Sequence, residues 1–173
     1  PYICQEEIRI LQKKNFRRVL DLANKQQKGY QLIVALNNLA TIYQTRGNLD
    51  LAENMLLLSL KMAQENNVKN VEASSCSNLG SLYKLRGDIV KSKQMYMNSI
   101  KINEELLKKE TETEEIKELS MSIASDYGTL GLVYNKEGDS DNAEGMILKS
   151  IEIAERHNFK ELLATQYGNL GTI

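Results

Sequence analysis

The architecture follows from Ser77-Asn78-Leu79-Gly80-Ser81-Leu82-Tyr83-Lys84-Leu85-Arg86-Gly87-Asp88, because approximate copies of these residues occur three more times. One copy begins upstream at Asn37 and another downstream at Gly128. A fourth begins at Gly168 and is cut off by the end of the sequence. Such self-similarity is typical of stacked supersecondary units, so the repeat is interpreted before any single residue.

The tyrosines of the copies set the period. Tyr43 and Tyr83 are 40 residues apart, and Tyr127 and Tyr167 are also 40 residues apart. Tyr83 and Tyr134 are 51 residues apart, which leaves an insertion of 11 residues. The period therefore holds along most of the chain and breaks between the second and third copies.

Each copy has the chemistry of one helix ending and another beginning. In the second copy, one face of a helix is marked at positions i, i+3, i+4 and i+7 by Cys76, Leu79, Gly80 and Tyr83. Gly87 then suits the left-handed position that follows a helix end, and Asp88 suits the cap of the next helix. The repeating unit is therefore predicted to be a helical hairpin.

This unit resembles the tetratricopeptide repeat, whose helix A carries a large residue, Leu, Gly or Ala, and Tyr, and whose helix B carries Ala, an aromatic or aliphatic residue, and Ala. The corresponding residues of the three full copies are Leu36, Leu39, Ala40, Tyr43, Ala52, Leu56 and Ser59, then Cys76, Leu79, Gly80, Tyr83, Ser92, Tyr96 and Ser99, then Tyr127, Leu130, Gly131, Tyr134, Ala143, Ile147 and Ser150. The chain departs from the family pattern at the closing proline, where Gln64, Glu104 and Glu155 stand. With its longer period, it is similar to the long-helix repeats of kinesin light chains, Leu-Gly-Asn spindle-orientation adaptors and bacterial Rap-type regulators.

The resemblance implies an all-α fold: a right-handed superhelix, or α-solenoid, of antiparallel helix hairpins in a single array. We expect helix B of an incomplete repeat at 1–28, repeat 1 at 29–68, repeat 2 at 69–119, repeat 3 at 120–159 and helix A of a truncated repeat 4 at 160–173. Within these repeats, helices are predicted over about 29–45, 49–64, 71–85 and 142–156, with others starting near 89 and 160.

The insertion lies near 108–118, a charged stretch without glycine or proline. One interpretation is that the preceding helix ends late and the following helix starts about two turns early, so that the hairpin tip protrudes. The other is a disordered loop. Both alternatives remain open at this point.

Polar residues suggest where several helices begin and end. Capping-box spacing occurs in Asp50 with Glu53, Thr111 with Glu114, and Asp141 with Glu144. A polar stop after the first helix B is predicted at Asn66-Asn67.

Composition excludes several classes of function. The net charge of −1 and the balanced charged residues give no broad attraction to nucleic acid. No apolar run is long enough to span a membrane, and no signal peptide is visible. We expect a cytoplasmic protein with no membrane partner. Cys4 and Cys76 are expected to be reduced thiols, with Cys76 in the core. With one histidine, His157, at a predicted helix end, no metal-spaced cluster and no phosphate loop, the sequence predicts no catalytic residue, metal or cofactor, and no enzyme.

The resemblance implies that a partner binds the inner wall of the superhelix, which is lined by helix A side chains outside the core. The predicted wall residues are small, polar and nearly uncharged: Asn37, Asn38, Thr41, Gln44, Ser77, Asn78, Ser81, Lys84, Thr129, Leu132, Asn135 and Asn169.

A row of asparagines carries the functional hypothesis. Asn38, Asn78 and Asn169 occupy the same place in three units, and an amide offers a donor and an acceptor to the main chain of a ligand. In the adaptors that this sequence resembles, that asparagine contacts the bound peptide. Thr129 interrupts the row, and Leu132 would offer an apolar contact. The alternative is that the amides bond to the neighbouring hairpin.

One known type of groove is not expected. Cochaperones that hold a C-terminal carboxylate use Lys and Asn, then Asn, then Lys and Arg on successive A helices. The corresponding residues are Asn37, Thr41, Asn78, Ser125 and Thr129, of which only Asn78 matches. Without the cationic groups, a carboxylate would lose its charge-assisted hydrogen bonds.

The sequence therefore predicts a protein-interaction scaffold that binds a partner peptide or helix and belongs to a larger multidomain protein. Two alternatives are kept. One is a structural spacer that self-associates through exposed terminal helices, including the apolar face of Leu163, Tyr167 and Leu170. The other is a sensory or regulatory module of an attached signalling enzyme.

Overall fold

The computed structural model describes residues 29–173, which are helical and contain no strand in that range. The helices run in the order α2 (Gly29–Thr45), α3 (Leu49–Glu65), α4 (Lys69–Arg86), α5 (Ile89–Leu107), α6 (Thr113–Glu137), α7 (Ser140–Arg156) and α8 (Lys160–Leu170). The predicted helix B of the incomplete repeat, at 1–28, lies outside the described residues. The predicted all-α solenoid is confirmed.

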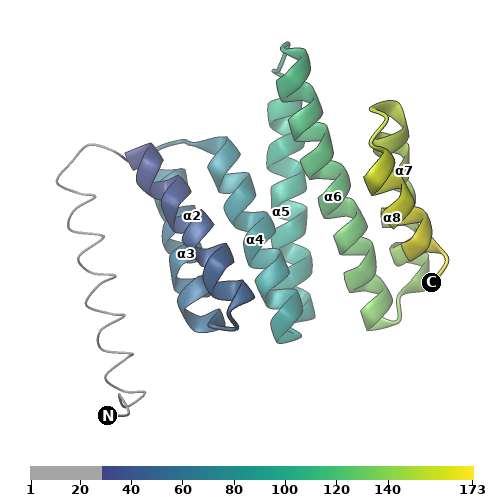
Figure 1. The fold of residues 1–173 in the computed structure, drawn as a ribbon, viewed down its shortest axis with the longest axis horizontal. Helices are drawn as coiled ribbons and strands as arrows, with labels where there is room; N and C mark the ends of the chain where they lie inside the picture. Colours follow the sequence, from purple (N-terminus) through teal and green to yellow (C-terminus); the bar gives the residue numbers. More distant parts are fainter. Residues whose placement is uncertain (1–28) are drawn as a thin grey trace.

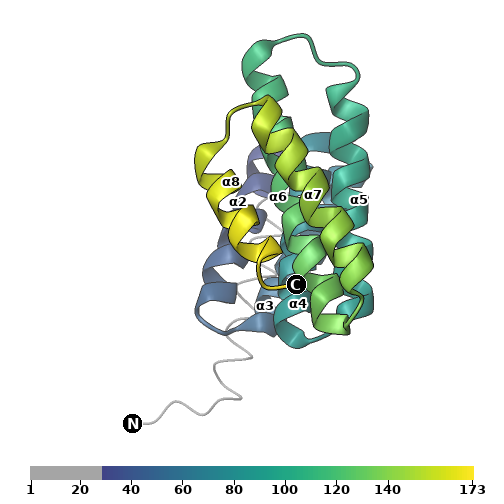
Figure 2. The same ribbon diagram turned by 90° about the vertical axis from the view of Figure 1, so that its right-hand side faces the viewer.

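The helices form hairpins that stand side by side in a row (Figure 1). Each helix packs against the next one in the chain, and α2 also reaches α4 while α6 reaches α8. Seen from the end of the row, α2 and α8 lie on one side and α5 and α7 on the other (Figure 2). The α2–α4 and α6–α8 contacts therefore place the first helices of these neighbouring hairpins next to each other.

Left-handed residues end the helices at regular places. Gly47, Gly87 and Gly138 follow the first helix of a hairpin with φ of 76°, 77° and 86°. Asn67 and Asn158 follow the second helix with φ of 55° and 57°. Asparagine tolerates this region better than most side chains, so it can close the turns between hairpins. The predicted roles of Gly87 and of the Asn66-Asn67 stop are confirmed.

Three helix caps lie at the residue just before the helix. The side chains of Asn48, Asp88 and Asp139 accept hydrogen bonds from the backbone N–H three residues later. The cap predicted at Asp88 is confirmed. The capping boxes predicted at Asp50 and Asp141 are wrong, because those residues already lie in the first helical turn.

The insertion forms a protruding helical tip. After Leu107, a short link leads to α6, which begins at Thr113. Counted back from the tyrosine of its repeat, α6 begins earlier than α2 and α4 do. Figure 1 shows α5 and α6 rising past the ends of their neighbours. The helical alternative is thus correct. The predicted cap at Thr111 is wrong, because Glu112 holds the cap position and makes no side-chain cap bond.

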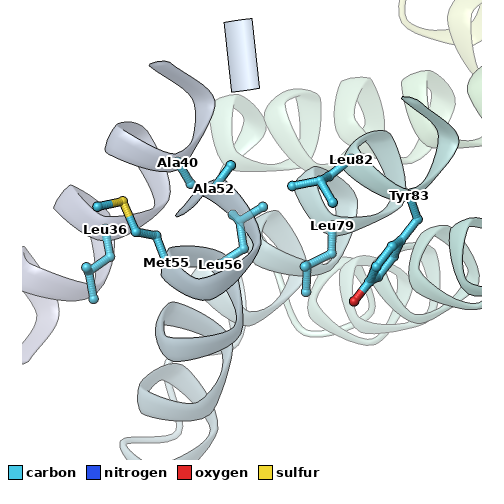
Figure 3. Packing of buried hydrophobic residues seen from close by; sticks show 8 residues of the cluster. All are labelled: Leu36, Ala40, Ala52, Met55, Leu56, Leu79, Leu82 and Tyr83. Carbon is cyan, nitrogen blue, oxygen red and sulfur yellow. The ribbon is translucent and has the colours of Figure 1, made fainter. Parts of the chain in front are cut away.

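The core is distributed between hairpins. Figure 3 shows the cluster shared by α2, α3 and α4, in which Leu36, Leu56 and Leu79 are fully buried. A second cluster joins α5 and α6 through residues such as Tyr96 and Leu130, with side chains of α7 packed against it. Burial between neighbours, and not in one centre, is what a repeat array predicts.

Gly131 allows α6 and α7 to pack closely against each other. A Cβ on Gly131 would lie 2.6 Å from Cγ1 of Ile147 and 2.9 Å from the carbonyl oxygen of Ala143. Only a residue without a side chain lets α6 and α7 approach this closely. The repeating small residue of the sequence pattern is therefore a packing requirement.

Serines hold the second helix of a hairpin to the first. Ser59 donates to the carbonyl of Ile33 at 3.0 Å, and Ser92 donates to that of Gly80 at 2.8 Å. These serines stand where the repeat pattern has alanine, and the cross-helix bonds satisfy their buried hydroxyls.

Candidate functional site

A groove of about 710 Å³ opens on the side of the first helices. It lies between α2, α4 and the projecting ends of α5 and α6, so three successive hairpins build it. "The groove" below means this cavity.

One wall comes from α2 and α4. Helical spacing turns one side of each helix to the groove, since side chains three or four positions apart share a face. The contributing residues are Tyr30, Val34, Asn37 and Asn38 on α2, and Asn70, Val71, Ser74, Ser77 and Asn78 on α4.

The opposite wall comes from α5, α6 and the link between them. Its residues again follow helical spacing: Asn103, Leu106 and Glu110, then Glu115, Glu118, Leu119 and Ser122. The early start of α6 is what places its acidic first turns here. This wall was missed from the sequence, because only the orientation of the insertion decides which of its faces meets α2 and α4.

Four of the twelve predicted site residues line the groove: Asn37, Asn38, Ser77 and Asn78. The other eight do not line it: Thr41, Gln44, Ser81, Lys84, Thr129, Leu132, Asn135 and Asn169. They belong to the C-terminal parts of α2 and α4, to α6 and to α8. The predicted wall therefore extends beyond the groove, and the two overlap only at these four residues of α2 and α4.

The asparagine row is partly bonded to the protein itself. Asn78 donates from Nδ2 to Oδ1 of the buried Asn37 at 2.8 Å. Asn169 donates to Oε1 of Gln166, within α8, at 3.1 Å. Asn38 is exposed on the groove wall and has no hydrogen bond to another side chain of residues 29–173. Asn38 is therefore the member of the row whose whole amide faces outward.

The other predicted polar residues also bond to the scaffold. The hydroxyls of Thr41 and Thr129 donate to helix carbonyls four residues earlier. Gln44 donates to Oγ of Ser81 at 3.1 Å and so ties α2 to α4. The bond between Gln44 and Ser81 therefore connects two neighbouring hairpins.

A buried carboxylate lies behind the groove wall. Ser77 donates to Oδ1 of Asp126 at 2.6 Å, and Asp126 is 4% exposed. Its Oδ2 has no hydrogen-bond partner among the described residues, and neither does the buried hydroxyl of Ser99. Burial raises the pKa of Asp126 to about 6, although the neighbouring hydroxyls of Ser77 and Ser99 oppose the shift.

Reactive groups are not gathered in the groove. Cys76 is buried, and burial raises the pKa of its thiol to about 12, so the nucleophilic thiolate is scarce at neutral pH. His157 caps the end of α7, as predicted for a helix end, and its ring stacks on Phe159 with centroids 5.4 Å apart. Residues 29–173 contain no cluster of three potential metal ligands. Nor does any helix in that range combine the length and apolarity needed to cross a bilayer.

Comparisons with known proteins identify the fold and the family of the chain. No curated protein sequence matches the chain. Among solved structures, BtubC (BKLC) from P. vanneervenii is similar with a TM-score of 0.74 and 21% identity, over 97% of this chain and 64% of that one. The likeness shows the fold, and the chain spans less than two thirds of BtubC. Two family models described as tetratricopeptide repeat match residues 32–67, and 73–106 with 127–157. The chain therefore belongs to the tetratricopeptide repeat family.

Proposed function

We propose that this protein is a non-catalytic interaction module that binds an extended or helical segment of a partner protein in the groove. Tetratricopeptide repeats generally mediate protein–protein interactions, which supports the general role. The observation that carries the location is the groove of about 710 Å³, lined by four helices and the α5–α6 link. A cleft of that size accommodates several side chains of a peptide.

The groove offers hydrogen bonds and apolar contacts together. Asn38 presents a donor and an acceptor to a ligand's main chain, and the Oδ1 of Asn78 remains available after its Nδ2 has bonded to Asn37. Val34 and Val71 supply apolar surface beside these amides. We therefore place the bound segment along α2 and α4, with Asn38 and Asn78 on its main chain. Asn169 and Leu132 would contact only a segment long enough to leave the groove.

Binding can be tested with phage-displayed random peptides selected on the immobilised chain. The affinities of selected peptides are then compared between wild type and Asn38→Ala. Losing up to two hydrogen bonds should weaken binding about fivefold. Asn98→Ala removes an exposed amide from α5, outside the groove, and should leave affinity unchanged. Equal affinities for all three proteins, or no selected peptide at all, would contradict the proposed site.

A second candidate is self-association through α8. Tyr167 is 52% exposed, and Leu163 and Leu170 are only partly buried. A mass that rises with protein concentration, and falls back when Leu163 and Leu170 are replaced by Ser, would favour this role over peptide binding.

A further inference from the structure

We propose that the occupant of the groove is a basic peptide segment, whose Lys or Arg side chains meet the carboxylates of Glu110, Glu115 and Glu118. This inference rests on the function proposed above and adds the chemistry of the partner. These three residues are called the acidic lip.

The charge of the groove has one sign. The acidic lip supplies three carboxylates, and the groove-lining residues include no Lys, Arg or His. Within residues 29–173, no cationic side chain lies within salt-bridge distance of the lip carboxylates. Concentrated charge of one sign on a concave wall attracts ligands of the opposite sign.

The hairpin tip separates its charges by face. Lys117 pairs with Glu114, on a part of α6 that does not line the groove. Lys108 and Lys109 are exposed and also lie outside the lining. The cations of the tip therefore lie away from the groove, and the face turned to the groove is acidic.

Backbone hydrogen bonds hold the carboxylate of Glu110 in place. Oε1 of Glu110 accepts from the backbone N–H of Thr111 at 2.8 Å and of Glu112 at 3.0 Å. These bonds lower the pKa of Glu110 and fix its orientation. Glu115 and Glu118 share one face of α6, three positions apart.

One buried amide, that of Asn103, points to a ligand rich in hydrogen-bond donors. Asn103 is 4% exposed, and its Nδ2 donates to Ser122 at 3.1 Å, while its Oδ1 accepts no hydrogen bond from the described residues. Because Asn103 belongs to the groove lining, its free acceptor complements Lys and Arg, which carry only donors.

Apolar residues of the groove indicate which other side chains the bound peptide should carry. Val34 and Val71 lie on one wall, and Leu106 and Leu119 on the other, beside the acidic lip. A basic side chain would lay its methylene stem along this surface and place its charge at the lip. The expected occupant therefore alternates basic with aliphatic or aromatic residues.

The test selects phage-displayed random peptides on the full chain and on the variant E110Q/E115Q/E118Q. Gln keeps the size and the acceptor oxygen while removing the charge. A control variant, E65Q/E144Q/E152Q, removes the same charge from exposed positions of α3 and α7 outside the groove.

Peptides selected on wild type should be enriched in Lys and Arg. They should bind the lip variant roughly tenfold more weakly, bind the control variant as tightly as wild type, and weaken as salt is raised. Selected peptides that lose affinity in Asn38→Ala but carry no basic excess, or that ignore the lip variant, would overturn this inference and leave the binding groove intact. A selection that yields no peptide, or only peptides indifferent to Asn38→Ala, would overturn both.

Discussion

Gly131 sets how closely α6 and α7 pack. We expect Gly131→Ala to destabilise the protein by about 1–2 kcal/mol, because the new Cβ would meet Ile147 and an immovable backbone carbonyl, and this overpacking exceeds the gain in helix propensity. Gly145→Ala is the matched control: a Cβ there meets nothing within 4 Å, so stability should rise by about 0.5–1 kcal/mol. Urea unfolding measures both, and equal effects would contradict the packing argument.

Asp126 makes stability depend on pH. Its pKa is raised by burial from 3.8 to about 6, so the folded chain binds more protons than the unfolded chain between these values. The free energy of unfolding should therefore fall as pH rises through this window, by about 2–3 kcal/mol in all. Asp126→Asn should remove that decrease and be the more stable protein at neutral pH.

Denaturant unfolding at several pH values checks this expectation. The informative quantity is the difference in unfolding free energy between wild type and Asp126→Asn, since other groups titrate alike in both. Asp141→Asn, at an exposed position of α7, controls for the change in net charge. A constant difference between pH 4 and 7 would show that Asp126 does not carry the burial penalty.

At the scale of the element, the caps decide where the second helices begin. The side chain of Asn48 accepts from the backbone N–H of Leu51 at 3.4 Å. Asn48→Ala should lower stability by about 0.5–1 kcal/mol, whereas Asn48→Asp keeps the acceptor and should be neutral. Asp50→Ala should cost less, because its ion pair with Arg86 is at an exposed carboxylate. Thermal unfolding ranks the stabilities of the three variants. A larger loss of stability for Asp50→Ala than for Asn48→Ala would instead support a cap at Asp50, as predicted from the sequence.

The sequence predicted the helices better than their caps. Period and apolar spacing located most helices to within a residue or two, because core residues such as Leu79 and Leu130 are needed for packing in every unit. The cap of α3 was predicted two residues too late, because Asn48 and Asp50 are both good capping residues. Only the backbone shows that Asn48 is the one that precedes the helix. Local chemistry alone could not separate them.

Only part of the groove, the candidate site, could be anticipated from the sequence. The faces of α2 and α4 follow from helical spacing, so Asn37, Asn38, Ser77 and Asn78 could be named in advance. The wall from α5 and α6 could not, because Asn103 lies on a second helix and reaches the groove only next to the elongated tip. The sequence analysis kept amide bonding between hairpins as an alternative, and Asn78 does bond to Asn37 in this way.

At the scale of the molecule, stability and the shape of the groove depend on contacts between neighbouring hairpins. The groove takes residues from three successive hairpins, so its shape depends on how each hairpin packs on the next. In a repeat array these nearest-neighbour interfaces also carry most of the stability. A segment that contacts both α2 and α6 would therefore stabilise the intervening hairpin when it binds.

The end of the row should open first. Gln166 is the buried residue of α8, whereas α4 buries nine, and α8 packs on α7 and α6 from one side. We expect amide protons of α8 to exchange with solvent at least about tenfold faster than those of α4, through local opening that leaves the central hairpins folded. Hydrogen exchange followed by mass spectrometry resolves the two helices. Leu163→Ala should speed exchange in α8 alone, while Leu79→Ala, at a fully buried position, should speed it throughout. Uniform protection along 29–173, unaffected by Leu163→Ala, would instead mean that the hairpins unfold as one cooperative unit.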